Sequence, residues 1–337
     1  MKKEITDLFE IIDRFTNKKI AVWGDYVLDE YVYTFSSRLS REAPVLILKY
    51  QNKTYSLGGA GNSVKNIKSL GGSPLPIGVI GQDVSGEKNL ELLTEAGIDT
   101  NYLIQTNHYS TPTKTRILAG GEHTRKQQVL RIDKEEKLGD EEKIKSEILS
   151  NLIKNIEKID ALLISDYNYY TVKEDIYYKI LPRLKKLAKP ITLDSRFRIL
   201  NFKEVTIATP NEPEVNHALK IEINDNPKLL EQAGVTILEK IASPALLITR
   251  GYKGMTLFEK GKKPFYIPIY GSDEIIDVTG AGDTVISTFT LALASGASFK
   301  QAALLSNYAG SIVVMKKGAA SLTQKELKEI LAKDIKN

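Results

Sequence analysis

Short apolar runs alternate with amphipathic helical stretches along most of this chain, and the alternation restricts its fold more than any other feature. Each run has the length of a buried strand. Strands that alternate with helices form a parallel sheet with helices on both faces. The expected fold class is therefore α/β, with a central, mostly parallel sheet flanked by helices. The predicted strands are Lys19–Trp23, Leu75–Ile80, Ala161–Ile164, Ile191–Leu193, Val205–Ala208 and Ala245–Thr249, and the clearest helices are Ser85–Ala96, Asp140–Lys158 and Val172–Leu187.

Four further β-forming segments lie outside this alternation. Strands inserted between the first sheet strand and its helix would make a small β lid over the carboxyl end of the sheet, where ligands of such folds bind. We expect a single domain over residues 1–337, with lid segments at about 30–56 and 106–132. The alternative is that the four segments are edge strands of the main sheet. They are Tyr31–Phe35, Val45–Leu48, Thr113–Leu118 and Gln128–Ile132.

Composition and charge exclude several classes of protein. With 337 residues, 42% of them apolar, the chain can bury a large core. Its 47 basic and 42 acidic residues are spread along the sequence, so nucleic acid is not an expected partner. The lack of cysteine excludes disulfides and thiolate metal sites. The N-terminus lacks the apolar core of a signal peptide and no apolar run is long enough to span a membrane, so we expect a cytoplasmic protein without membrane contact.

Two glycine-rich helix entrances carry the strongest functional signal. One reads DVTGAGDT at 277–284, and the other reads LGGAGNS at 57–63. Glycine lets a ligand approach the backbone, and the unpaired N–H groups at a helix start bind anions such as phosphate. Asp283 would be placed to take a proton from an attacking hydroxyl, and the amide of Asn62 suits a sugar hydroxyl. The alternative is that Asp283 only complements the helix dipole and that the glycines only form turns.

Polar residues follow several predicted strands, which is where ligands of parallel sheets bind. These residues are Asp25, Ser165, Asp166, Asp194, Asn211 with Glu214, and Thr249 to Gly251. The first strand is not followed by the G-x-G-x-x-G of a dinucleotide site, which counts against a nicotinamide enzyme. Phosphoryl transfer is therefore the first hypothesis.

Four ordered motifs resemble those of the ribokinase-like (PfkB) carbohydrate kinases. DVTGAGDT resembles their second signature, and GGAGN at 58–62 is similar to their first. NEPE at 211–214 resembles their N-x-x-E motif, and TRGYKG at 249–254 resembles their T-x-G-x-x-G. Order and spacing agree from about residue 17 to residue 330. The resemblance implies a central sheet with a small β lid, and ATP-dependent phosphorylation of a sugar hydroxyl.

The resemblance also implies roles for single residues. Asp283 corresponds to the catalytic base, and the anion hole would be formed by the backbone of Gly280, Ala281 and Gly282. Asn211 and Glu214 correspond to residues that organise Mg²⁺ and its water around the ATP phosphates. Sugar contacts are implied for Asp25, Gly58, Gly59 and Asn62, and nucleotide contacts for Thr249, Gly251, Gly254 and Asn307. A K⁺ ion beside the anion hole would have Asp277 and Ser321 as its nearest candidates.

The segment SRLSREAPVLIL at 37–48 resembles the heptose 7-phosphate kinases of lipopolysaccharide precursor synthesis, and TKTRIL at 113–118 and QQVLRID at 127–133 resemble their lid. A phosphosugar brings a dianion, so its pocket needs cations. The cations available in these segments are Arg38, Arg41, Lys114, Arg116 and Arg131. The alternative for each is a solvated surface charge.

The acceptor implied by this resemblance is D-glycero-D-manno-heptose 7-phosphate, which would give the 1,7-bisphosphate. The chain departs from the subfamily at SDYNYY (165–170), where Lys-Gly usually follows the tyrosine, and at DSR (194–196), where D-P-K is usual. Two alternatives therefore stay open: a PfkB kinase of another sugar or phosphosugar, and a sugar-binding regulator without catalysis. We also expect a homodimer formed through the lid, and nucleotide activation of the product by another protein.

Overall fold

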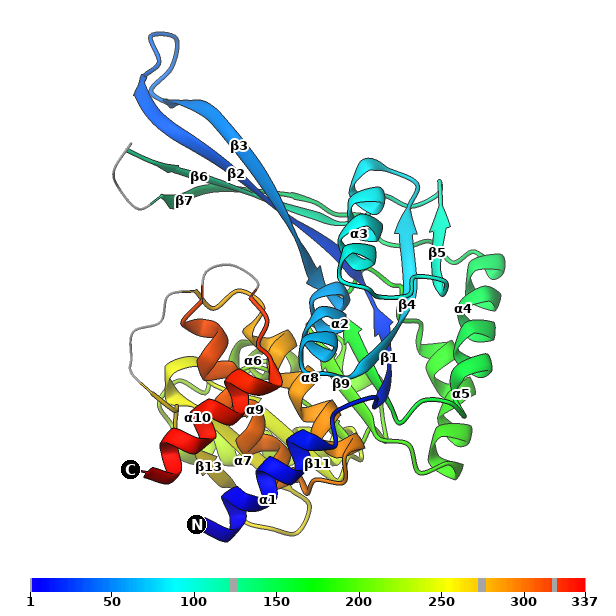
Figure 1. Cartoon of the computed structure of the whole chain (residues 1–337). Coiled ribbons are helices and arrows are strands. Elements are labelled where there is room, and N and C mark those ends of the chain that lie inside the picture. Colours follow the sequence, from blue (N-terminus) through cyan, green and yellow to red (C-terminus); the bar gives the residue numbers. More distant parts are fainter. Residues whose placement is uncertain (1, 122–125, 272–276, 317–319, 337) are drawn as a thin grey trace.

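The computed structural model describes residues 2–121, 126–271, 277–316 and 320–336. Its centre is a nine-stranded sheet in the order β13-β12-β11-β10-β9-β8-β1-β4-β5 (Figure 1). Neighbouring strands are parallel from β11 to β5, whereas β12 and β13 are antiparallel at one edge. The prediction of a mostly parallel sheet is confirmed. The strands are β1 Lys19–Gly24, β4 Ser73–Gly81, β5 Leu103–Thr106, β8 Ala161–Asp166, β9 Ile191–Ser195, β10 Ile207–Ala208, β11 Ala245–Thr249, β12 Met255–Glu259 and β13 Phe265–Ile267.

Helices cover both faces of this sheet, because alternate side chains of each strand are buried on opposite faces. In β1, Ile20 and Val22 belong to one hydrophobic core, and Ala21 and Trp23 belong to the other. The first core is closed by α1 Lys2–Asp13, α2 Ala60–Ser69, α3 Val84–Glu95, α8 Ala281–Ala294, α9 Phe299–Val314 and α10 Gln324–Lys336. The second is closed by α4 Glu142–Asn155, α5 Glu174–Lys186, α6 Glu212–Leu219 and α7 Pro227–Lys240.

A separate four-stranded sheet, which we call the small sheet, has the order β3-β2-β6-β7. Its strands are β2 Tyr26–Leu39, β3 Leu46–Gly59, β6 Thr113–Gly120 and β7 Gln127–Lys134. β2 follows directly after β1, and β3 leads directly into α2, so this hairpin is inserted between the first main-sheet strand and its helix. Figure 1 shows the outer part of the hairpin projecting away from the body. The four segments are therefore not edge strands of the main sheet.

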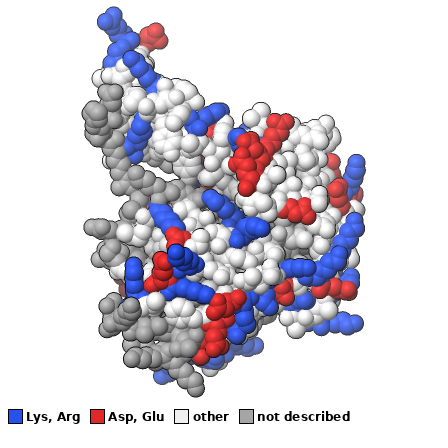
Figure 2. Space-filling model, in the orientation of Figure 1, with Lys and Arg blue, Asp and Glu red and all other residues white. Residues whose placement is uncertain are grey.

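The surface and the helices show two further features. On the face seen in Figure 2, basic and acidic side chains are interspersed, and neither sign forms one continuous patch. Within the residues that the structure describes, none of the helices has the length and apolar character needed to cross a membrane.

Candidate active site

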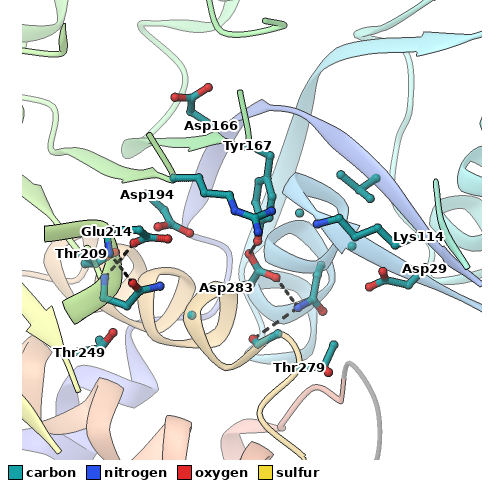
Figure 3. Close-up of a pocket in the computed structure, with 18 of the residues that line it drawn as sticks. Asp29, Lys114, Asp166, Tyr167, Asp194, Thr209, Glu214, Thr249, Thr279 and Asp283 are labelled. Atoms are coloured by element: carbon teal, nitrogen blue, oxygen red, sulfur yellow. Dashed lines mark hydrogen bonds between the residues drawn. The ribbon is translucent and has the colours of Figure 1, made fainter. Parts of the chain in front are cut away.

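A pocket of about 320 Å³ lies at the carboxyl ends of the parallel strands, between the small sheet and the start of α8. Figure 3 shows Asp283 near its centre, with Lys114 and Asp29 on one side and Asp194 and Glu214 on the other. Many residues predicted from the sequence line this pocket together: Gly58, Gly59, Asn62, Lys114, Arg116, Asn211, Glu214, Thr249, Gly280, Gly282 and Asp283.

The two glycine-rich entrances lie side by side because α2 and α8 pack through buried polar side chains. The hydroxyl of Thr284 donates a hydrogen bond to the side-chain oxygen of Asn66 (3.1 Å), and the hydroxyl of Ser287 donates to the carbonyl of Ser63 (3.1 Å). All four residues are buried. These contacts fix two helix N-termini at one site, which is an arrangement suited to an anionic ligand.

Helix α8 begins with backbone groups open to the pocket. Its N-cap is Gly280, which has a left-handed φ of 77° and provides no side-chain cap. A Cβ added to Gly282 would meet no atom within 4 Å, so the backbone here faces open space. The uncapped N–H groups and the helix dipole together favour negative charge at this point.

Asp283 is held at this helix start as a buried carboxylate, with 4% of its surface exposed. The amide of Asn62 donates to one carboxylate oxygen (2.8 Å), and the hydroxyl of Tyr167 donates to the other (3.0 Å). Burial raises the pKa of Asp283 to about 6, while these two hydrogen bonds oppose the increase. A carboxylate with this pKa is mostly ionised at neutral pH and is a suitable general base.

Asp194 and Glu214 lie opposite the small sheet, with Asn211 beside them. Asn211 caps α6 and exchanges hydrogen bonds with Glu214 in a capping box (2.8 and 2.9 Å). Burial raises the pKa of Glu214 to about 7, and burial together with Glu214 and Asp283 raises the pKa of Asp194. Buried carboxyls with such pKa values fit a site that a cation completes. Within the described ranges, no three His, Cys, Asp or Glu residues are grouped so that they could bind a metal ion by themselves.

A smaller, mostly apolar cavity of about 140 Å³ adjoins the pocket and shares Thr249 and Gly282 with it. Other predicted residues that line it are Gly251, Gly254, Ala281 and Asn307. Gly254 has a φ of 77°, and a Cβ there would lie 2.1 Å from the carbonyl oxygen of Ile267, so only glycine fits. The side-chain amide of Asn307 donates to the carbonyl of Pro268 (2.9 Å). An apolar cleft of this kind fits a flat purine base.

On the side of the main pocket next to the small sheet lie two cations, Lys114 from β6 and Arg196 from the segment after β9. Lys114 is largely buried, and its ammonium lies 5.2 Å from the centre of the Tyr167 ring. Burial lowers the pKa of Lys114. Arg116 forms an ion pair with Asp29 (2.6 Å). Arg196 lines the same pocket. In the described part of the chain, Lys114 and Arg196 form no ion pair with a carboxylate, so both are available to an anionic ligand.

The structure does not place Asp25, a predicted sugar contact, in this pocket. Asp25 is fully buried, does not line the pocket, and accepts hydrogen bonds from the backbone N–H groups of Tyr167, Tyr169 and Thr171 (2.8, 3.1 and 3.0 Å). Asp29 lines the pocket instead. Asp29 could have been recognised in the sequence as an acidic residue within the otherwise apolar start of a strand.

The arginines predicted at the outer lid are also not in this pocket. Arg38 and Arg41 are exposed beside the outer turn of the β2–β3 hairpin, and Arg38 donates to the carbonyl of Leu39 (3.3 Å). Arg131 pairs with Asp133 (2.8 Å) and lines a neighbouring cavity, which shares Tyr167 and Arg196 with the pocket. The cations that reach the pocket are therefore those nearest the body of the protein.

The proposed K⁺ ligands do not line the pocket either. The side chain of Asp277 accepts the N–H of Thr279 (2.9 Å), and the carbonyl of Ser321 accepts a hydrogen bond from the ammonium of Lys316 (2.9 Å). One of the two expected oxygen ligands thus already contacts a cationic side chain. The K⁺ site stays a prediction.

Eight residues of the pocket were not among the predicted site residues: Val27, Asp29, Asp166, Tyr167, Asp194, Arg196, Thr209 and Thr279. Asp194 was noticed only as a polar residue after a strand. Tyr167 and Arg196 belong to the two segments that depart from the heptose kinase pattern.

Comparison with known proteins identifies the family. The model of the pfkB family carbohydrate kinases matches residues 17–326. The chain belongs to this family. The matched range includes both glycine-rich entrances, the main sheet and the small sheet. The protein is therefore a carbohydrate kinase of the PfkB family, and the kinases of this family use ATP.

Relatives with curated names agree with this assignment. The chain is 36% identical over 318 residues to the bifunctional protein HldE of Desulfatibacillum aliphaticivorans, and the match covers 94% of this chain and 64% of that protein. It is 34% identical over 318 residues to HldE of Helicobacter pylori strain Shi470, covering 93% and 66%. The chain thus spans less than two thirds of the length of these relatives.

Solved structures share the fold at lower identity. Arabidopsis thaliana ribokinase complexed with ribose and ATP superposes with a TM-score of 0.71 at 20% identity, covering 94% of this chain and 99% of that one. Escherichia coli phosphofructokinase-2 in complex with fructose-6-phosphate gives a TM-score of 0.72 at 17% identity with the same coverage. The ribokinase-like fold class is confirmed.

Proposed function

We propose that this kinase transfers the γ-phosphoryl group of ATP to a hydroxyl of a phosphosugar, and that the acceptor is D-glycero-D-manno-heptose 7-phosphate, giving the 1,7-bisphosphate. The observation that carries the proposal is one pocket with a buried carboxylate, Asp283, at its centre and two cations, Lys114 and Arg196, that form no ion pair among the residues the structure describes. The similarity to HldE proteins supports heptose as the sugar.

The geometry suits direct transfer between two substrates. Asp283 would take the proton of the accepting hydroxyl, whose oxygen then attacks the γ-phosphorus as ADP leaves. The backbone at Gly280 to Gly282 and the dipole of α8 would stabilise negative charge on the transferring group. The apolar cavity beside Asn307 would take the adenine.

Mg²⁺ fits the wall of the pocket that contains Asn211 and Glu214, and these two residues would hold it through water. A bound Mg²⁺ would neutralise phosphate charge, and burial raises the pKa of Glu214 although the nearby charge of Arg196 opposes the increase, so a further cation would stabilise its carboxylate. The direct ligands would come mainly from the ATP phosphates, because the described residues offer no group of three or more metal-binding side chains.

The acceptor phosphate would be held by Lys114 and Arg196. Both face the pocket and neither forms an ion pair within the described residues, whereas the charge of Arg116 is already balanced by Asp29. Lys114 is buried and Arg196 is half-buried, and a buried cation without a partner is costly, so this arrangement favours an anionic ligand. The second candidate is a kinase of a neutral sugar, in which Asp29 would bind hydroxyl groups.

The experiment is a screen of acceptors by coupled release of ADP. Heptose 7-phosphate, hexose 6-phosphates and the matching unphosphorylated sugars are compared at equal concentration. We expect the phosphorylated heptose to give the largest kcat/KM. A higher kcat/KM for an unphosphorylated sugar would refute the phosphosugar assignment, and ADP release that does not depend on any sugar would refute transfer to a carbohydrate.

We also propose that two copies associate through their small sheets, which would act as lids. Large apolar side chains are exposed on this sheet, at the hairpin tip and on β7: Leu39, Val45, Leu46, Tyr50, Val129, Leu130 and Ile132. A patch of this kind on a projecting sheet is expected to be covered. Analytical ultracentrifugation should show a dimer for the wild type, and Leu130→Glu should shift it to monomer. A monomeric wild type would refute the proposal.

A further inference from the structure

The segment that follows β8, residues 167–171, forms a tight loop beside the pocket. Buried groups that bond to its backbone determine its conformation. Asn168 and Tyr170 have left-handed φ values of 68° and 67°, a region that asparagine tolerates but that a bulky tyrosine adopts only when its surroundings compensate for the cost. The compensation comes from the buried carboxylate of Asp25, which accepts three backbone N–H groups of the loop. Tyr167 is the first residue of this loop.

A buried ion pair fixes the start of the same loop. Asp166, the last residue of β8, accepts hydrogen bonds from the guanidinium of Arg198 (Nε at 3.2 Å) and from the hydroxyl of Ser195 (2.6 Å). Arg198 also donates to the carbonyl of Val172 (3.0 Å), just beyond the loop. Both ends of the loop are thus tied to one guanidinium, so the position of Tyr167 is set by the buried structure.

The side chain of Tyr167 contacts both parts of the acceptor site. Its hydroxyl donates to Asp283 (3.0 Å), and its ring lies under the ammonium of Lys114, 5.2 Å from the ring centre. The ring also lies close to Gly59, since a Cβ added to that residue would be 3.4 Å from it. Figure 3 shows Tyr167 pointing into the pocket toward Asp283, whereas Asp166 points away from it.

We propose that Tyr167 is a positioning residue for phosphoryl transfer, whose hydroxyl orients the carboxylate of Asp283 toward the acceptor and whose ring holds Lys114 at the acceptor side. This inference rests on the proposed role of Asp283 as the base. Each carboxylate oxygen accepts one hydrogen bond, from Tyr167 or Asn62, so each retains a lone pair for the acceptor's proton. Tyr167 keeps its own proton throughout.

The effect of the Tyr167 hydroxyl on the pKa of Asp283 can be measured separately from that of the surrounding charges. Besides Tyr167, the groups that face Asp283 are Asn62 on α2, Asp29 on β2, Lys114 on β6, Asp194 on β9 and Glu214 on α6. Burial raises the pKa of Asp283, and the Tyr167 hydroxyl lowers it by stabilising the charged form. Removing only this hydroxyl must therefore raise the pKa of Asp283, while the other groups stay in place.

The first test compares Tyr167→Phe with Tyr169→Phe. Tyr169 is in the same loop, but its hydroxyl binds Glu135 (2.5 Å), so it is a matched control for loss of a tyrosine hydroxyl. In Tyr167→Phe we expect kcat at neutral pH to fall about tenfold to a hundredfold and the acid limb of the kcat profile to move upward by about one pH unit. The KM values should stay unchanged, and Tyr169→Phe should keep the wild-type profile.

The second variant is Tyr167→Leu, which also removes the ring. The loss of kcat should persist, and the KM of the acceptor should now rise about threefold to tenfold because Lys114 loses its support, while the KM of ATP stays constant. A residue with a merely structural role would lower stability in both variants without this separation of kcat from KM. Circular dichroism verifies that both variants are folded.

The outcomes separate this inference from the proposed function. If Asp283→Asn is inactive but Tyr167→Phe keeps the wild-type kcat and pH profile, Tyr167 has no positioning role and the kinase mechanism stands. If Asp283→Asn is as active as the wild type, the mechanism fails, and the inference fails with it. Carbon-13 NMR titration of Asp283 without substrates gives a readout independent of turnover. A pKa that is equal in wild type and Tyr167→Phe would also overturn the inference.

Discussion

The two sides of the pocket are built from different kinds of groups. The nucleotide side consists mainly of backbone at the start of α8 and of a cleft that requires glycine at Gly254. The acceptor side consists of charged side chains that reach in from the small sheet and from the segment after β9, chiefly Lys114 and Arg196. In the proposed function, one side would therefore accept any nucleoside triphosphate that fits, whereas single side chains would determine which acceptor binds on the other side.

This difference affects what substitutions can do. A backbone site responds mainly to added side-chain volume, because its N–H groups remain when a side chain is replaced. A side-chain site can be changed one contact at a time, and the change should appear in the KM of one substrate only. Four measurements would sharpen or break this contrast.

The largest effect is expected for Asp283→Asn. The substitution preserves shape but removes the base, so kcat should fall on the order of 10²- to 10⁴-fold. ATP and acceptor binding, measured by calorimetry, should stay close to wild type because neither the backbone of α8 nor the cations are altered. A variant that retains most of its kcat would show that Asp283 is not the base.

The acceptor side should respond most to Lys114→Ala and Arg196→Ala. Each removes a charge-assisted contact to the acceptor phosphate, so acceptor KM should rise roughly tenfold to a hundredfold while ATP KM stays constant. Arg131→Ala is the matched control, because Arg131 pairs with Asp133 outside the pocket. Equal effects in all three variants, or a parallel rise in ATP KM, would remove the distinction between the two sides.

Replacing the proposed Mg²⁺-organising residue, Glu214→Gln, should increase the Mg²⁺ concentration needed for half-maximal activity about tenfold. Glutamine can still accept the N–H of Asn211, so the capping box should persist. Glu212→Gln is the control, since Glu212 lies on the same helix and pairs with Arg250 (2.6 Å). An unchanged Mg²⁺ titration in Glu214→Gln would exclude this role.

The smallest effect concerns pH. The pKa of Asp283 is raised to about 6 by burial, so the base loses its charge as pH falls through this value. We expect kcat to be about half its plateau at pH 6 and about tenfold lower at pH 5. Glu214→Gln should show the same acid limb, which would assign the limb to Asp283. A plateau that extends to pH 4 would contradict this assignment.

Much of the body was predictable from the sequence because its strands are buried on both faces and therefore read as continuous apolar runs. The predicted strand Ala245–Thr249 is β11, and the predicted helix Ser85–Ala96 differs from α3 by one residue at each end. The short edge strand β5 was missed because four residues give no periodicity. The hairpin strands β2 and β3 are 14 residues each, far longer than predicted, since polar stretches such as KYQNKT at 49–54 interrupt the apolar pattern along the strand.

The site, like the fold, has a part that could be predicted from the sequence and a part that could not. Motif residues such as Gly282 and Asp283 were predicted together with Gly59 and Asn62 because each pair lies within a few residues of one helix start. The acceptor side depends on which strand residues reach the pocket, and this is set by the register of β2 against β6. Arg38 is nine residues beyond Asp29 on the same strand, so sequence similarity alone could not show that it lies far outside.

The insertion of the β2–β3 hairpin between β1 and α2, where it pairs with β6, makes part of the proposed acceptor site a replaceable module. Asp29 is carried by the inserted hairpin and Lys114 by the neighbouring β6, whereas Asp283 and Glu214 belong to the body. Exchanging the hairpin and β6 between paralogues is thus expected to change sugar preference through Asp29 and Lys114, whereas Arg196 and the base Asp283 remain in the body.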